Sequence, residues 1–181
     1  MRLVILDRDG VINRESDAYI KSPDEWIPVP GSLEAIAELN RAGFTVVVAS
    51  NQAGIGRGLF DREALERIHG RMTQALAEKG AHLDGIFFCP HHPDDHCDCR
   101  KPKPGLLKQI SAKFSVPLDR VPVIGDSLRD LEAARAVGAR PILVRSGYGE
   151  KTLQQLDQTA DIEIFRDLAA AAAALIRGTK S

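Results

Sequence analysis

Short runs of consecutive apolar residues recur along the chain, separated by longer stretches in which apolar residues stand three or four positions apart. Short runs rich in Val, Ile and Phe are typical of buried β-strands. Because the runs are continuous rather than alternating, both faces of these strands should be covered, as they are in parallel sheets. We predict strands at Leu3–Leu6, Phe44–Ala49, Gly85–Phe88, Val121–Ile124 and Ile142–Val144, and a weaker sixth at Asp161–Phe165.

The longer stretches have the periodicity of amphipathic helices, with one apolar face that we assign to the hydrophobic core. We predict helices at Ser32–Ala42, Asp61–Lys79, Leu106–Phe114, Leu128–Val137 and Leu168–Ile176. This alternation of strands and helices predicts an α/β fold, a three-layer, Rossmann-like parallel sheet with helices on both faces. We expect residues 1–177 to form a single domain and residues 178–181 to form a flexible tail.

Composition narrows the class of partner. The 181 residues include 24 Lys and Arg against 25 Asp and Glu, which gives no electrostatic basis for general nucleic-acid binding. The first apolar run, Leu3–Leu6, ends in charge and is too short for a signal peptide or a membrane span. We therefore expect a cytoplasmic protein that acts on a small molecule, without nucleic acid or membrane as partner. We also expect a monomer.

Polar residues follow three of the predicted strands. The first strand leads into Asp7-Arg8-Asp9-Gly10, the second into Ser50-Asn51-Gln52, and the fourth into Gly125-Asp126-Ser127. In an open parallel sheet such positions lie at the edge where ligands bind. The carboxylates of Asp7, Asp9 and Asp126 would repel one another there without a cation, and carboxylate oxygens suit Mg²⁺. A magnesium site in turn favours a phosphorylated substrate.

Two segments match neither pattern, Arg8–Pro30 and Pro90–Pro104, and their length favours a functional role. The second contains Arg100 and Lys101, which can supply positive charge to a phosphate. The stretch Ser50–Gly58 adds a hydroxyl, side-chain amides and backbone N–H groups in a Gly-rich turn able to wrap an anion. Because this stretch lacks the Gly-Lys-Ser/Thr ending of a Walker loop, nothing supports nucleotide hydrolysis.

These motifs, in this order, resemble those of phosphatases of the haloacid dehalogenase (HAD) superfamily. The matching residues are Asp7-Arg8-Asp9-Gly10-Val11, Ser50, Lys101 and Gly125-Asp126 followed by Asp130. The resemblance implies a HAD fold, here without a large cap domain, because no helical block of about 60–100 residues interrupts the pattern.

The resemblance also implies a mechanism. Asp7 would attack phosphorus and form an aspartyl-phosphate, and Asp9 would act as general acid and then as general base. Ser50 and Lys101 would hold the phosphate oxygens. Mg²⁺ would be bound by the side chains of Asp7 and Asp126 and the backbone carbonyl of Asp9. Asp130, on the following helix, would either support the metal ligands or bind a water molecule of the metal.

The three cysteines stand close together in the chain, which is useless as a disulfide framework and typical of metal ligation. Three thiolates and one imidazole complete a tetrahedral zinc site, and a fully ligated zinc ion is structural. On chemistry alone the imidazole can come from His91, His92 or His96, and resemblance to the Cys-x-His…Cys-x-Cys loop of related phosphatases implies His91. A set of reactive surface thiols is the alternative. The predicted ligands are Cys89, His91, Cys97 and Cys99, in a zinc loop spanning residues 89–99.

Over essentially the whole chain, these features are similar to one family within the superfamily, the D-glycero-D-manno-heptose-1,7-bisphosphate 7-phosphatases. The similarity implies removal of the C7 phosphate on the route to ADP-heptose and lipopolysaccharide, with Arg100 on the distal phosphate. Histidinol-phosphate phosphatases share the zinc loop and are the alternative. Further candidate substrate contacts are Asn51, Gln52, Ala53, Tyr19 and Arg57, of which the last two could equally cover a loop.

A hypothesis of a different class is a zinc-stabilised module without catalytic activity. It would bind nucleic acid through Arg100, Lys101 and Lys103. Three basic residues on a chain of net charge −1 make a weak basic patch, and this hypothesis leaves the acidic strand ends unexplained.

Overall fold

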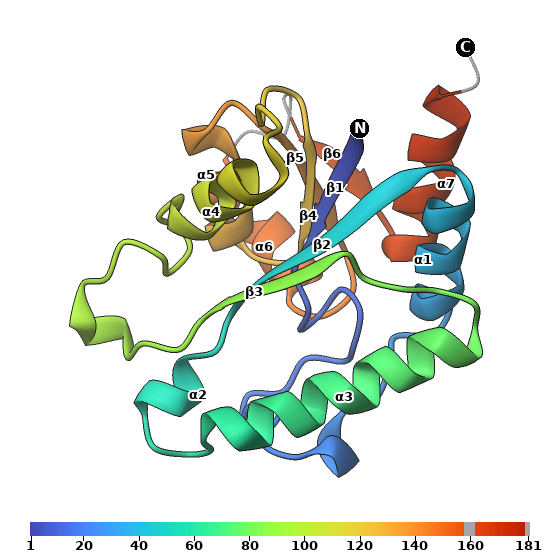
Figure 1. Cartoon of the computed structure of the whole chain (residues 1–181). Helices are drawn as coiled ribbons and strands as arrows, with labels where there is room; N and C mark the ends of the chain where they lie inside the picture. Colours follow the sequence, from blue (N-terminus) through green and yellow to red (C-terminus); the bar gives the residue numbers. More distant parts are fainter. Residues whose placement is uncertain (158–161, 180–181) are drawn as a thin grey trace.

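A computed structural model describes residues 1–157 and 162–179. Its centre is a six-stranded parallel sheet in the order β3-β2-β1-β4-β5-β6, between two layers of helices (Figure 1). The predicted three-layer α/β fold is therefore confirmed. The strands are β1 (Arg2–Leu6), β2 (Phe44–Asn51), β3 (Gly85–Cys89), β4 (Pro122–Gly125), β5 (Arg140–Val144) and β6 (Glu163–Phe165).

The helices include every helix that the sequence predicts and two further short ones. These two, α2 and α6, are too short to carry a full apolar stripe, which is why periodicity misses them. The helices are α1 (Ser32–Arg41), α2 (Ala53–Gly56), α3 (Arg62–Glu78), α4 (Gly105–Phe114), α5 (Leu128–Ala136), α6 (Gly149–Gln155) and α7 (Leu168–Gly178), with 3₁₀ turns η1 (Pro23–Glu25) and η2 (Pro93–Asp95).

Several predicted ends shift by one or two residues because capping residues stand half inside a helix. Asp61, the predicted first residue of α3, instead caps it, its carboxylate accepting from the Ala64 N–H at 2.8 Å. Helix α7 begins at Leu168, as predicted, and the carboxylate of its cap Asp167 accepts from the Ala170 N–H at 2.9 Å. Helix α7 continues to Gly178, the first residue of the predicted tail. Asp161, where the sixth strand was predicted to begin, and residues 180–181 lie outside the described residues.

The apolar stripes cover both faces of the sheet, as the continuous strand patterns predict. Val4 and Leu6 of β1 point into a core shared with α1, α3 and α7. Leu3 and Ile5, the alternate positions, point into a second core shared with α4 and α5. Strand β1 is thus buried on both sides at the centre of the molecule, which gives the residues that follow it a rigid support.

The segment between β1 and α1 lies across the carboxyl ends of the strands (Figure 1). Its apolar residues Val11, Ile12, Ile20 and Trp26 are buried in the first core, so this long loop is held in place. Within the described residues, no separate cap domain covers this edge of the sheet.

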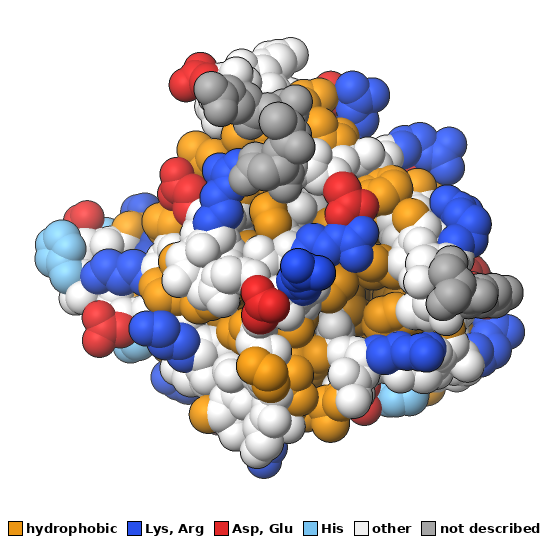
Figure 2. Space-filling view, turned by 90° about the horizontal axis from the view of Figure 1, so that it is seen from above, with side chains coloured by type: hydrophobic (Ala, Val, Ile, Leu, Met, Phe, Trp, Pro, Cys, Tyr) orange, Lys and Arg blue, Asp and Glu red, His pale blue; other side chains and the backbone are white. Residues whose placement is uncertain are grey.

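The opposite edge, at the amino ends of the strands, is seen in Figure 2. Basic, acidic and hydrophobic side chains are interspersed on this face, which therefore presents no uniform charge. None of the helices in the described part of the chain is long and apolar enough to cross a bilayer.

Candidate active site

A small polar cavity of about 50 Å³ lies at the carboxyl ends of β1 and β4, as the strand-end argument predicts. It brings together Asp7, Asp9, Asn51, Lys101 and Asp126, which the sequence singles out. It also contains residues that sequence reasoning missed as site residues. The full lining is Asp7, Asp9, Glu15, Asn51, Lys101, Asp126, Ser127, Arg129 and Tyr148.

The carboxylates of Asp7, Asp126 and Asp130 are the electrostatic centre of the site. One oxygen from each lies within 4.8 Å of the others. Burial, reinforced by the neighbouring carboxylates, raises the pKa of both Asp7 and Asp126 above the ordinary aspartate value. A cluster of hard oxygen donors in which each charge disfavours the next is suited to a divalent cation such as Mg²⁺.

Gly10 lets the first loop approach Asp126. It has a φ of +84°, and a Cβ at this position would overlap the Asp126 carboxylate. The Ser146 hydroxyl donates to the Gly10 carbonyl at 2.7 Å, and the Tyr148 N–H donates to Asp126 Oδ2 at 2.8 Å. The segment after β5 therefore fixes both sides of this close approach, for which only glycine leaves room.

Lys101 is almost completely buried and has three acceptors around its ammonium group. Nζ donates to Asp130 at 2.6 Å and to the Ala49 carbonyl at 2.7 Å, and it lies 3.1 Å from Asp7 Oδ1. Although burial disfavours the charged form, Asp130 and Asp7 raise the pKa of Lys101, so it stays protonated. Asp130 thus pairs with Lys101 through Oδ1, while its Oδ2 accepts from the N–H and the hydroxyl of Ser127.

Asn51 positions the backbone of Lys101. Its side-chain Nδ2 donates to the Lys101 carbonyl and its Oδ1 accepts from the Lys101 N–H, both at 3.0 Å. Because this pair links the end of β2 to the loop before α4, it aligns the lysine with the strand ends. Direct contact of Asn51 with substrate stays a prediction.

Asp9 is held by several donors. Its Oδ1 accepts from Arg8 and from Asn13, and its Oδ2 accepts from Gln52 Nε2 at 3.0 Å. Although burial acts in the opposite direction, the Arg8 guanidinium and these hydrogen bonds hold the pKa of Asp9 below its usual value. Gln52 also donates to the Ser50 hydroxyl at 2.8 Å.

The remaining predicted residues of the phosphate turn lie outside the lining of the small cavity. Ser50, Gln52 and Ala53 are buried at the end of β2 and the start of α2. Arg57, at the end of α2, is exposed. The structure thus places the turn beside the carboxylates but does not bring Arg57 to them.

Arg100 lies in an unusual environment for a cation. Burial and the positive charge of Arg129 lower its pKa, and its Nη1 is buried with no hydrogen-bond partner among the described residues. The Tyr19 side chain lies close enough to act on the same guanidinium. Two arginines placed near each other, with one donor unused, are arranged to receive an anion.

Glu15 and Tyr148 connect the small cavity to larger ones. A cavity of about 340 Å³ shares both residues, and another of about 360 Å³ shares Ser127, Arg129 and Tyr148. Burial raises the pKa of Glu15 to about 7. The site therefore opens from a carboxylate pocket into spaces able to hold a larger polar molecule.

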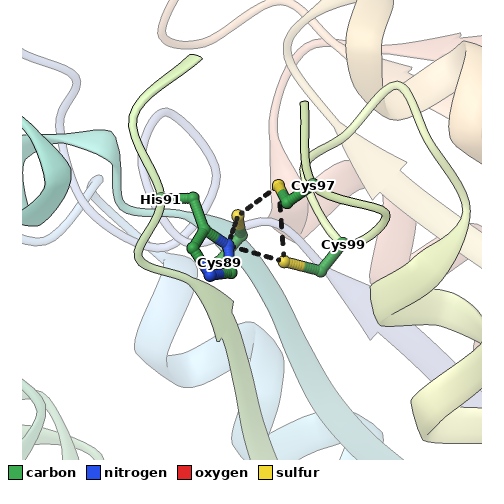
Figure 3. A group of neighbouring side chains, drawn as sticks. All are labelled: Cys89, His91, Cys97 and Cys99. Atoms are coloured by element: carbon green, nitrogen blue, oxygen red, sulfur yellow. Dashed lines mark hydrogen bonds between the residues drawn. The ribbon is translucent and has the colours of Figure 1, made fainter. Parts of the chain in front are cut away.

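The predicted zinc ligands form a second cluster, which joins the end of β3 to the loop before α4 (Figure 3). Its members are Cys89, His91, Cys97 and Cys99. His91 Nδ1 lies 3.4 Å from Cys89 Sγ and 3.2 Å from Cys99 Sγ, and Cys97 Sγ lies 3.6 and 3.7 Å from the other two sulfurs. Tetrahedral zinc with Zn–S bonds of about 2.3 Å separates its sulfurs by about 3.8 Å. These four ligand atoms therefore fit one zinc ion.

The cluster uses His91 of the three candidate histidines. The Nδ1 atom of His92 instead accepts from the Asp94 N–H at 3.0 Å, where it caps η2. The loop is also tied to the active site, because the Gln52 N–H donates to the Cys89 carbonyl at 2.8 Å. The candidate zinc loop and the predicted phosphate-binding turn are therefore joined by a direct backbone hydrogen bond.

Two family models match the chain. The HAD-hydrolase-like family matches residues 98–171, and the polynucleotide kinase 3 phosphatase family matches residues 2–129, which is more than half of the chain. The second match includes Asp7 and Asp126 at the ends of β1 and β4 and Lys101 in the loop before α4.

Curated relatives match over nearly the full length. The D-glycero-beta-D-manno-heptose-1,7-bisphosphate 7-phosphatase of Bordetella bronchiseptica is 54% identical over 177 residues, which is 98% of this chain and 99% of the relative. The protein of the same name from Pseudomonas aeruginosa is 54% identical over 97% of this chain and 98% of its own length.

Solved structures agree. The D,D-heptose 1,7-bisphosphate phosphatase from B. bronchiseptica, crystallised with magnesium and phosphate, has a TM-score of 0.96 and 53% identity, covering 98% of this chain and 99% of that one. The corresponding enzyme from Burkholderia thailandensis has a TM-score of 0.78 and 45% identity, covering 97% and 99%.

Proposed function

Because the chain belongs to the HAD-like phosphatases, in the family of the D-glycero-beta-D-manno-heptose-1,7-bisphosphate 7-phosphatases, we propose that it hydrolyses the C7 phosphate of that heptose bisphosphate. The observation that carries the proposal is the convergence of Asp7, Lys101 and Asp126 in a chain so similar to those enzymes. The products would be the heptose 1-phosphate and inorganic phosphate.

In the first step, a carboxylate oxygen of Asp7 bonds to phosphorus while the bond from phosphorus to the C7 oxygen breaks. Asp9 transfers its proton to the departing oxygen, so the sugar leaves as an alcohol. The contacts around Asp9 favour its ionised form, and a phosphate dianion bound beside it would raise the pKa of its carboxyl group and favour uptake of that proton.

In the second step, Asp9 takes a proton from water, and the water oxygen bonds to phosphorus as the Asp7 oxygen leaves. This restores Asp7 as a free carboxylate and Asp9 as the protonated acid. Lys101, held by Asp130 and the Ala49 carbonyl, would stabilise the charge on the phosphoryl oxygens throughout. Ser50 is proposed to donate to the same oxygens.

The donor set of the cavity fits Mg²⁺, which we propose as the cofactor. The side chains of Asp7 and Asp126 and the backbone carbonyl of Asp9 would hold it, and when bound it neutralises repulsion between the nucleophile and the phosphate. We propose a structural zinc ion for Cys89 and its three partners, because their ligand atoms have tetrahedral spacing.

The distal phosphate at C1 would bind at Arg100, with Arg129 beside it. Within the described residues, one Arg100 donor is buried without an acceptor, and the positive charge of Arg129 lies near enough to lower the pKa of Arg100, with Glu15 as an acidic neighbour of Arg129. A second phosphate would supply the missing acceptor and a negative charge between the two arginines.

The three cysteines are free, which fits the reducing environment of the cytoplasm. We propose that the enzyme acts there as a monomer.

The test is a comparison of kcat/KM for the β and α anomers of the heptose bisphosphate, histidinol phosphate and a 3′-phosphorylated oligonucleotide. The last of these represents the polynucleotide phosphatase match. We expect the β anomer to give the highest value, since the relatives are named for it. A higher value for histidinol phosphate or the oligonucleotide would contradict the proposed substrate.

A further inference from the structure

Arg8 is a fully buried cation that the proposed chemistry leaves without a role. Its Nε and Nη2 both donate to Asp9 Oδ1, at 3.0 and 2.7 Å. Its remaining terminal nitrogen, Nη1, lies 3.2 Å from Nε2 of His69, which stands 61 positions away on α3. One guanidinium thus links a helix outside the cavity to the proposed acid/base residue.

The chemistry of the pair determines the state of His69. A guanidinium has only donors, so Nε2 of His69 must accept, and the ring is neutral with its proton on Nδ1. Burial, assisted by the Arg8 charge, lowers the pKa of His69 to about 4, in agreement with this direction of the hydrogen bond. The ring also packs edge-on against Phe88, with centroids 6.2 Å apart.

The two oxygens of Asp9 are therefore not equivalent. Oδ1 accepts two hydrogen bonds from Arg8 and one from Asn13 at 2.9 Å. Oδ2 accepts one, from Gln52 at 3.0 Å. Because Oδ1 already has three donors, it has little capacity to bind a proton, whereas Oδ2 retains a free lone pair.

Building on the proposed function, we propose that His69 is a positioning residue for the acid/base step, holding Arg8 so that Asp9 Oδ2 carries the proton. In the first half-reaction this proton moves from Oδ2 to the departing C7 oxygen. In the second, a proton moves from the attacking water to Oδ2. His69 itself exchanges no proton and touches no substrate.

Replacing His69 with leucine removes the acceptor and leaves Arg8 Nη1 buried without a partner, so the guanidinium can rotate and release Asp9. We expect kcat to fall by about 10-fold to 100-fold, the loss typical of a small displacement of a catalytic group. KM should change little, because His69 lies outside the lining of the cavity.

Leaving-group dependence separates this role from a purely structural one. In His69→Leu, formation of the phosphoenzyme from the heptose bisphosphate, whose alkoxide needs a proton, should slow by at least about tenfold. Formation from p-nitrophenyl phosphate, whose leaving group needs none, should keep its wild-type burst rate. The later hydrolysis step should slow equally for both substrates, since both share one intermediate.

Two variants keep the result interpretable. His69→Gln places an amide oxygen where Nε2 stood and should restore most of kcat, while His69→Phe preserves apolar packing on Phe88 and should behave like His69→Leu. His82→Leu, at an exposed histidine paired with Asp84, is the matched control and should match wild type. Circular dichroism establishes that each variant is folded.

Equal slowing of the burst with both substrates would overturn the proposal. So would a loss confined to KM, or a His69→Gln variant as impaired as His69→Leu. If wild type does not hydrolyse the heptose bisphosphate, the proposed substrate fails, and an alkyl phosphate that is hydrolysed replaces it in the same comparison. The two failures are thereby distinguished.

Discussion

Arg100 and Lys101 are neighbours in the chain, yet their charged groups differ in how many hydrogen-bond acceptors surround them. The Lys101 ammonium is surrounded by three acceptors, whereas Arg100 has a buried nitrogen with no acceptor in the part of the chain that the structure describes. A cation that already has partners is ready to stabilise a transferring phosphoryl group. A cation that lacks them has unused capacity for a permanent anion, and this difference underlies the two phosphate positions proposed here.

Arg100→Ala should therefore lower kcat/KM for the heptose bisphosphate by about tenfold or more, corresponding to loss of a charge-assisted contact of about 1.5–3 kcal/mol. Turnover of p-nitrophenyl phosphate, which has no second phosphate, should remain close to that of wild type. Steady-state kinetics with both substrates measure the difference. Equal losses would instead place Arg100 at the transferred phosphate.

Gly10 offers a second test at the scale of one residue. Gly10→Ala and Gly43→Ala both place a side chain at a φ near +85°, at a cost of about 1–2 kcal/mol each. The new Cβ would overlap the Asp126 carboxylate at Gly10, whereas at Gly43 it would have no atom of the described residues within 4 Å. We expect both variants to have a lower melting temperature than wild type. Only Gly10→Ala should lose most of its phosphatase activity. Similar activity in the two would contradict the close approach.

The sequence identifies Asp7, Asp9 and Asp126 because strand ends in a parallel sheet converge by topology alone. Glu15, Arg129 and Tyr148 are different. They reach the cavity from a loop, the first turn of α5 and the residue before α6, and no periodicity fixes where such side chains point. The His69–Arg8 contact was invisible for the same reason, since the helical pattern assigns α3 only an apolar face.

Among the elements, the loop between β3 and α4 carries both the candidate zinc ligands and Lys101 of the proposed active site. It begins at Cys89, whose carbonyl accepts from Gln52, and leads directly into Lys101. The Gly105 N–H donates to the Asp98 carbonyl at 3.1 Å and closes the loop at the start of α4. A metal ion that fixes such an irregular segment reduces the conformational freedom of the lysine that follows it.

Adjacent histidines provide a test of this element. His91→Ala should lose the zinc, which in wild type amounts to about one ion per chain by the four-ligand count. It should also lower kcat by about tenfold or more as Lys101 loses its support. His92→Ala removes only the cap of η2 and should retain zinc and activity. Elemental analysis of reduced, dialysed protein decides, and full zinc content in His91→Ala would contradict the site.

At the scale of the whole molecule, the alternation of strands and helices was sufficient to predict the order of layers, because each apolar run has one way to be buried. The short helices α2 and α6 are not predicted from the sequence, because they have too few turns to give a periodic pattern of apolar residues. The same sheet that organises the core also concentrates carboxylates at one edge. Stability and metal binding should therefore be linked.

The linkage has a definite sign. The fold raises the pKa values of Asp7 and Asp126. At pH values between the ordinary aspartate pKa and these raised pKa values, the unfolded chain therefore binds fewer protons than the native protein. Stability of the metal-free protein should consequently fall as the pH rises through this window. Mg²⁺ binds the ionised carboxylates, so its stabilising effect should grow with pH.

Thermal unfolding with and without Mg²⁺ at about pH 5.5 and about pH 8 measures this linkage. At one fixed Mg²⁺ concentration, set to 100 times the dissociation constant at the higher pH, the ion should stabilise the protein by about 2.7 kcal/mol at that pH. The same concentration should stabilise it by less at the lower pH, where binding is weaker. Asp126→Asn should abolish most of the gain. An increase in melting temperature that is independent of pH, or that survives in Asp126→Asn, would contradict a cation at this cluster.

The most direct test of the account is the fate of phosphate on Asp7. Wild-type enzyme turning over the heptose bisphosphate with Mg²⁺ is quenched in acid within the first turnover, digested and mapped by mass spectrometry. The account predicts phosphate on the peptide that contains Asp7, and none in an Asp7→Asn variant that is folded and inactive. Phosphate on another residue, or near-normal turnover by Asp7→Asn, would contradict it.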